Sequence, residues 1–149
     1  MEIKRDAYLQ QLIERKDNGM IKVITGIRRC GKSFLLFTIF KRYLLENGVD
    51  TDHIIEIALD GIENEELRDP KVCYKFIKDA MKDSKKYYLL LDEVQFMPRF
   101  EEVLNSLLRI RLSLHQMQKK IWIDFFNIFP LKRKMNKQPE IFLTILEIH

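Results

Sequence analysis

Residues 26 to 33 read Gly-Ile-Arg-Arg-Cys-Gly-Lys-Ser, so two glycines five positions apart precede a lysine and a serine. Glycine lets a turn adopt positive φ and lets backbone N–H groups approach phosphate oxygens that a Cβ atom would exclude. Lys32 could then reach the β and γ phosphates of a nucleotide, and the Ser33 hydroxyl could ligate magnesium. The segment predicts a phosphate-binding loop. The alternative is a glycine turn in an unrelated strand–helix unit.

A pair of acids follows the apolar run Tyr87-Tyr88-Leu89-Leu90-Leu91. Such a run is typical of a strand buried on both faces, and two carboxylates at its end are costly unless they serve a function. In a phosphoryl-transfer site, Asp92 would hold the magnesium ion and Glu93 would polarise the attacking water. The alternative is that both acids are solvated at the start of a loop.

We expect the loop and the residue after it to contact the nucleotide. Cys30 lies near a predicted helix start, where a thiol can become oxidisable, although a small residue that simply fits there is the simpler interpretation. Two arginines could contact phosphate or point into solvent. The predicted nucleotide-binding residues are Gly26, Ile27, Arg28, Arg29, Cys30, Gly31, Lys32, Ser33 and Phe34.

At these motifs the chain resembles the prokaryotic AAA-type P-loop ATPases in which an amino-terminal ATPase core precedes a separate carboxyl-terminal domain. The resemblance covers residues 1–108. It implies ATP and Mg²⁺ as cofactors, with Ser33 and Asp92 on the metal and Lys32 and Glu93 in catalysis. It also implies hydrolysis at a subunit interface with an arginine from a neighbour, for which Arg109 and Arg111 are the nearest candidates. The matching segments are Lys22 to Ser33, Asp52 to Ile55, Glu65 to Asp69 and Tyr88 to Gln95.

Hydrophobic periodicity predicts elements that would place both motifs at one edge of a sheet. Strands separated by helical crossovers indicate an α/β fold with a parallel sheet covered on both faces. We therefore expect a P-loop NTPase fold of three layers, α/β/α, with a mostly parallel sheet. The acidic connector at 60–69 reads as a solvated surface. Helices are predicted at 6–15, 32–46, 70–82 and 99–108, and strands at 20–25, 53–59 and 87–92.

The family fold places one more strand between the loop strand and the acid-bearing strand, ending in a polar residue that senses the γ phosphate. No Thr-Gly-Ser-Asn-like stretch follows Leu108, so we expect the sheet to be incomplete at its carboxyl-terminal end. Two apolar runs, 121–126 and 141–146, could instead supply strands. Asp124 or Asn127 would then be the polar residue near the phosphate.

Residues 109–149 differ in composition from the predicted ATPase core at 1–108. This tail has eight Lys or Arg against three Asp or Glu, whereas residues 1–108 have eighteen against nineteen. All five glycines lie at or before Gly61. We interpret the tail as an atypical basic segment, disordered or out of frame. A shift of the coding frame near Arg109 to Ser113 would explain it, since Ser113 to Lys119 back-translated in another frame admits Ser, Asn, Ala and Lys.

Composition bounds the remaining function classes. The 149 residues are 46% apolar and 32% charged, which is ordinary for one soluble domain. No run reaches membrane-span length and the charged start is not a signal peptide, so we expect a cytoplasmic protein without a membrane partner. Cys30 and Cys73 form no CxxC pair, and the three histidines share no metal-ligand spacing.

Three alternatives to an ATPase stay open. Basic residues interleaved with aromatic residues in the tail have the composition of a nucleic-acid-binding surface, although solvated lysines are the simpler interpretation. A truncated relic could bind nucleotide weakly without turnover. A small-molecule kinase uses the same loop, but Glu93 beside Asp92 favours water as the nucleophile. A homo-oligomer is also expected from the resemblance.

Overall fold

The computed structural model describes residues 6–16, 21–25, 29–112, 123–127 and 141–148. Its five-stranded sheet has the order β2-β3-β5-β1-β4. β2 pairs with β3, and β1 with β4, in parallel, while β5 is antiparallel to both β1 and β3. The sheet is therefore mostly parallel, as the sequence predicts. The strands are β1 Ile21–Thr25, β2 Ile54–Ala58, β3 Tyr87–Asp92, β4 Ile123–Asn127 and β5 Ile141–Ile148.

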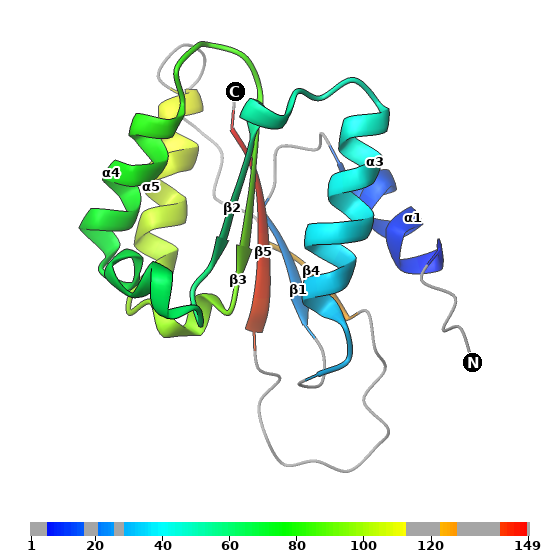
Figure 1. The fold of residues 1–149 in the computed structure, drawn as a ribbon, viewed down its shortest axis with the longest axis horizontal. Helices are drawn as coiled ribbons and strands as arrows, with labels where there is room; N and C mark the ends of the chain where they lie inside the picture. Colours follow the sequence, from blue (N-terminus) through cyan, green and yellow to red (C-terminus); the bar gives the residue numbers. More distant parts are fainter. Residues whose placement is uncertain (1–5, 17–20, 26–28, 113–122, 128–140, 149) are drawn as a thin grey trace.

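Helices cover both faces of the sheet and give the three-layer α/β/α arrangement (Figure 1). α1 (Asp6–Arg15) and α3 (Lys41–Glu46) lie on one face, whereas α4 (Pro70–Ala80) and α5 (Phe100–Leu112) lie on the other. The helix after the loop starts as α2 (Lys32–Phe34), continues as the π-helix η1 (Leu35–Phe40) and ends as α3. Short 3-10 segments are η2 Thr51–His53, η3 Ile62–Arg68 and η4 Val94–Phe96.

Alternate residues of the strands point into two separate apolar layers, because successive side chains of a strand face opposite ways. Tyr87, Leu89 and Leu91 pack toward α4 and α5, whereas Tyr88 and Leu90 pack toward α1, η1 and α3. All six residues of β3 are buried. The prediction of a strand buried on both faces, made from the continuous apolar run, is confirmed.

The start of α4 shows why the predicted boundaries hold. The Asp69 carboxylate accepts hydrogen bonds from the backbone N–H groups of Lys71 and Val72, at 2.9 and 3.0 Å. Pro70 occupies the first turn, where its missing N–H costs nothing. A capping aspartate is typically worth about 1 kcal/mol of stability.

The strand between β1 and β3 differs from expectation in direction. The position where the sequence leaves a gap is filled by β5, whose residues pair with Lys22 to Thr25 on one side and with Tyr87 to Asp92 on the other. β4 lies on the far side of β1, at the edge of the sheet. The centre of the sheet is thus closed by an antiparallel strand from the last residues of the chain.

Candidate functional site

The predicted phosphate-binding loop lies between β1 and α2 in the chain. Gly26, Ile27 and Arg28 lie outside the described residues. Arg29 and Gly31 both have positive φ, 64° and 86°. This left-handed region favours glycine, and for an arginine it costs about 1–2 kcal/mol. The described part of the loop therefore contains two left-handed residues, one of which is not glycine.

The helix start positions the side chains that follow the loop. Lys32 is buried, with 5% of its surface exposed, and its Nζ lies 3.5 Å from Cys30 Sγ. Ser33 and Phe34 are exposed, whereas Cys30 is half-buried. A buried ammonium group is costly unless other groups compensate its charge. Lys32 is therefore placed as a cation at the edge of the sheet, beside the end of β3.

Asp92 lies at the carboxyl end of β3 and is 4% exposed. Burial raises the pKa of its carboxyl group, while hydrogen bonds from the Ser33 hydroxyl and the Glu93 backbone N–H, and the charge of Lys32, act in the opposite direction. The Glu93 N–H donates to Asp92 Oδ1 at 2.9 Å. The side chains of Ser33 and Lys32, which follow the loop, therefore lie near the acid at the end of β3.

Glu93 opens a tight turn immediately after β3. Its φ is 54°, and the Phe96 N–H donates to its carbonyl oxygen at 3.0 Å. Its carboxylate accepts a hydrogen bond from Gln95 Nε2. Partial burial raises the pKa of Glu93 first, with the charges of Asp92 and Asp60 adding to the rise, although Gln95 and Lys32 lower it. A carboxylate held this way can act as a base near neutral pH.

Sequence reasoning missed Asp60. It follows β2 by two residues, and β2 pairs with β3 so that Ala58 is opposite Asp92. The Leu59 N–H donates to the Asp92 carbonyl oxygen at 3.1 Å. The charge of Asp60 consequently raises the pKa of both Asp92 and Glu93. The signal was available: the carboxyl ends of parallel strands meet at one edge, so an acid after strand 54–58 belongs beside an acid after strand 87–92.

The other residues that the sequence analysis singled out lie on other elements of the described structure. Asn127 pairs with Thr25 and Asp124 with Lys22, but on β4, which lies on the side of β1 away from β3. Arg109 is exposed on α5. Arg111 belongs to the part of α5 for which only the backbone is described. His53 bonds Asp83 at 3.1 Å and packs on Tyr87, at the opposite end of the strands.

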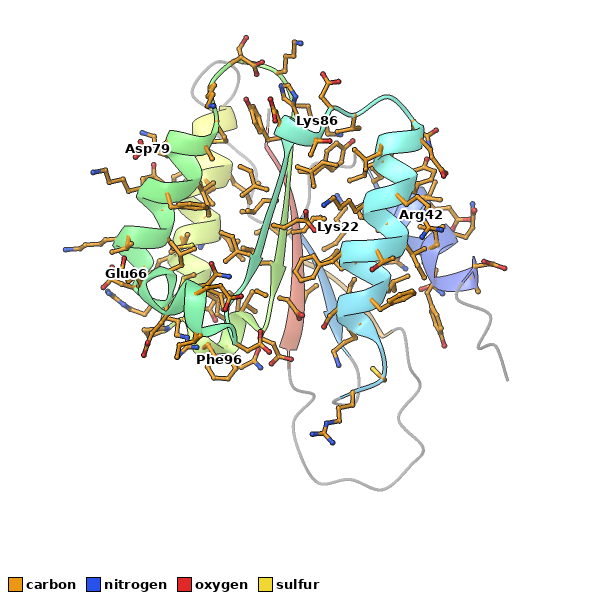
Figure 2. The ribbon with its side chains drawn as sticks, viewed as in Figure 1. Lys22, Arg42, Glu66, Asp79, Lys86 and Phe96 are labelled. Atoms are coloured by element: carbon orange, nitrogen blue, oxygen red, sulfur yellow. The ribbon has the colours of Figure 1, made fainter. Side chains whose placement is uncertain are left out.

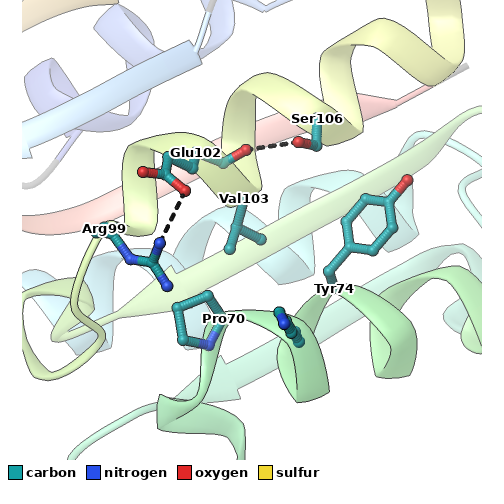
Figure 3. Close-up of a pocket in the computed structure, with 7 residues that line it drawn as sticks. Pro70, Tyr74, Arg99, Glu102, Val103 and Ser106 are labelled. Carbon is teal, nitrogen blue, oxygen red and sulfur yellow. Dashed lines mark hydrogen bonds and ion pairs between the residues drawn. The ribbon is translucent and has the colours of Figure 1, made fainter.

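A separate groove of about 250 Å³ lies between α4 and α5 (Figure 3). Its main charges pair with each other, because Arg99 Nη1 lies 3.5 Å from Glu102 Oε2. No residue of the Lys32–Asp92 cluster lines it. We therefore assign the functional site to the sheet edge. The groove is lined by Pro70, Lys71, Tyr74, Arg99, Glu102, Val103 and Ser106.

Comparison with known proteins identifies the family of this chain. The profile of the family described as "AAA domain" matches residues 18–124, which include both motifs. An uncharacterised protein of Haemophilus influenzae is 38% identical over 106 residues, which are 70% of this chain and 26% of that protein. The chain thus spans about a quarter of the length of this relative. No solved structure matches this chain. Within the described residues, none of the helices has the length and apolar character needed to cross a membrane.

Proposed function

Because the chain belongs to the AAA domain family, a family of nucleotide-binding domains, we propose that it binds ATP at the edge formed by the loop, Ser33 and Asp92, and hydrolyses it. The observation that carries the proposal is that the Ser33 hydroxyl and the charge of Lys32 both act on the buried Asp92 carboxyl group and lower its pKa, which brings the two motifs together. Lys32, buried beside them, supplies the positive charge that the β and γ phosphates require.

The oxygen donors of the site suit magnesium. A hydroxyl and a carboxylate are hard ligands, and Mg²⁺ is usually held by one or two such groups together with phosphate oxygens and water. Ser33 lies near enough to Asp92 for its hydroxyl to lower the pKa of that carboxyl group. In the proposed site these two side chains hold the ion. When bound, magnesium neutralises charge on the phosphates.

Glu93 is the proposed base. It directly follows Asp92 in the chain, and its carboxylate accepts a hydrogen bond from Gln95. This carboxylate can accept a proton from the water that attacks the γ phosphorus. The raised pKa of Glu93 in the nucleotide-free protein strengthens it as a proton acceptor. The Lys32 ammonium group would stabilise the charge on the transferred group.

Calorimetric titration with ATP and magnesium tests the binding step. We expect Lys32→Ala to lower the affinity by about ten- to a hundredfold, because a charged hydrogen-bond donor is removed. Lys75→Ala is the matched control, since Lys75 is exposed on α4. Equal affinities for the parent and Lys32→Ala would reject the proposed site.

Phosphate release tests the chemical step. Glu93→Gln should keep the parental ATP affinity and lose turnover, because the amide cannot accept the proton. Glu101→Gln, on the exposed first turn of α5, removes the same charge elsewhere. A Glu93→Gln variant that hydrolyses like the parent would remove Glu93 from the mechanism.

The same measurements decide the alternative of a non-catalytic relic, which predicts binding without turnover by the parent. Turnover that rises faster than protein concentration would indicate that copies of the chain complete each other's sites, as the neighbour's arginine requires. Nucleic-acid binding by the basic tail predicts an affinity that falls steeply with salt.

A further inference from the structure

The loop after β2 is held by two side chains that sequence reasoning assigned to a solvated connector. Asn64 Nδ2 donates to the Ala58 carbonyl oxygen at 2.9 Å. Arg68 Nε donates to the Leu59 carbonyl oxygen at 2.8 Å. Arg68 Nη2 donates to the carbonyl oxygens of Asp60 and Gly61, at 3.2 and 3.4 Å. Four successive carbonyl groups of this loop therefore bond protein rather than relying on water alone, which fixes its conformation.

Arg68 also contacts the turn that contains Glu93. Its guanidinium carbon lies 5.2 Å from the centroid of the Phe96 ring, within cation–π range. Phe96 ends η4, at the lower edge of the sheet in Figure 2, and its N–H closes the turn on Glu93. The ring is 45% exposed, so the arginine covers one part of an otherwise open aromatic side chain.

These contacts form a closed path around the two acids. The Leu59 N–H bonds the Asp92 carbonyl oxygen, and the Leu59 carbonyl oxygen bonds Arg68. Arg68 packs on Phe96, and Phe96 bonds Glu93. A residue with the left-handed φ of Glu93 persists only when its surroundings hold it, and this path is what surrounds it.

Resting on the proposed hydrolysis, we propose that Arg68 is a positioning residue for that reaction. It locks the loop containing Asp60 against the turn containing Glu93, and so holds the Glu93 carboxylate toward the attacking water. Its Nε and Nη2 donors are used by backbone carbonyl groups, which distinguishes it from an arginine that contacts phosphate. The effect on catalysis is therefore indirect, through Glu93.

The kinetic test compares Arg68→Ala, Arg68→Lys and Asn64→Ala. We expect Arg68→Ala to lower kcat by about ten- to a hundredfold, with the Kd for ATP within about twofold of the parent. Arg68→Lys keeps the charge and one donor, so it should restore part of kcat. Asn64→Ala loosens only the loop after β2 and should keep most of the parental kcat. A parent that binds ATP without turnover overturns the proposed hydrolysis, whereas a parent with turnover and an Arg68→Ala variant at parental kcat overturns this inference.

Amide hydrogen exchange of the nucleotide-free chain gives a readout that does not depend on turnover. Arg68→Ala should speed exchange both in residues 59–61 and in residues 93–97, because it bonds one segment and packs on the other. Asn64→Ala should speed only the first segment. Faster exchange in residues 59–61 alone for Arg68→Ala would show that the two segments are not coupled, and would overturn the inference.

Phe96→Leu keeps the test decisive if Arg68→Ala fails to fold. Leucine keeps an apolar side chain but removes the aromatic face, while the carbonyl bonds of Arg68 stay intact. We expect faster exchange in residues 93–97 only, together with a lower kcat. Parental exchange and parental kcat in this folded variant would overturn the inference.

Discussion

The Ser33 hydroxyl lies beside the Asp92 carboxyl group and lowers its pKa, so the first turn of α2 meets the end of β3. The two residues belong to strand–helix units that are far apart in the chain but adjacent at one edge of the sheet. An oxygen pair of this kind forms only if both strands run in the same direction, since only then do their carboxyl ends meet. The mostly parallel sheet is thus what assembles the site.

Asp92 is expected to limit the stability of the nucleotide-free protein. Asp92→Asn removes a buried charge but keeps an oxygen that can accept the bonds of Ser33 and the Glu93 N–H. We expect the free energy of unfolding at pH 7 to rise by about 0.5–2 kcal/mol, as is common when a functional site is relieved of strain. Urea denaturation without magnesium measures it.

The gain in stability of Asp92→Asn should depend on pH. Burial raises the folded-state pKa of Asp92, so its contribution to stability is greatest below the ordinary aspartate value and is lost as pH rises through the folded pKa. The advantage of Asp92→Asn should therefore shrink near pH 4. Asp83 is a control in which the pKa is shifted in the opposite direction. Its pKa is lowered, mainly by a hydrogen bond from the Lys85 N–H. Asp83→Asn should lower stability at pH 7, and equal behaviour of the two variants would contradict the assignment.

Gly31 and Gly48 allow backbone strain to be separated from loss of function. Their φ values are 86° and 85°, so alanine at either position should cost about 1–2 kcal/mol of stability. A Cβ at Gly48 would meet no atom within 4 Å, so strain is the only cost there. We expect both variants to be destabilised, and only Gly31→Ala to lose affinity for ATP in calorimetry. Loss of affinity in Gly48→Ala would mean that global stability, not loop geometry, controls binding.

The two cysteines should report whether the loop is occupied. Burial raises the pKa of the Cys73 thiol to about 11, so it should react with iodoacetamide only after unfolding. Cys30 is half-buried beside Lys32 and should be alkylated in the native protein. ATP with magnesium should slow this reaction severalfold, as mass spectrometry can measure. Alkylation of Cys30 at the same rate with saturating ATP would place the nucleotide elsewhere.

Local patterns were sufficient for the elements that carry the motifs. The apolar run at 87–91 predicted β3, and the helix predicted from residue 70 begins there as α4, because both features depend on residues that are adjacent in the chain. Periodicity also predicted one helix over 32–46, but could not reveal that its middle, Leu35–Phe40, is a π-helix. That depends on which backbone groups bond, which side-chain spacing does not encode.

The remaining features could not be predicted from the sequence, because they depend on contacts between residues far apart in the chain. Arg68 sits in an acidic segment that looks solvated in sequence, and its role depends on the carbonyl groups of residues 59–61 and on Phe96. Likewise, the centre of the sheet is filled by β5, although the expected strand would have run parallel. The order and direction of the strands depend on which strand pairing closes the core. No local sequence pattern predicts that pairing.

Residues 113–149 supply both β4 and β5 of the sheet. β5 pairs with β1 on one side and β3 on the other, so the sheet is continuous only through it. A chain that ends at Leu112 would leave both strands with unpaired backbone groups at the centre of the sheet, which are costly when buried. We expect this truncated chain to lose cooperative thermal unfolding, as measured by circular dichroism.

A shifted coding frame near Arg109 to Ser113 makes a different prediction. Residues that did not evolve with the fold should add little stability, so the truncated and full-length chains would then melt alike. In that case, reading the genomic nucleotides in the alternative frame should reveal a polar residue at the end of a parallel central strand. A chain rebuilt with that continuation should bind ATP more tightly than the present one, because Asp92 and Ser33 would be held by a strand of the family's direction.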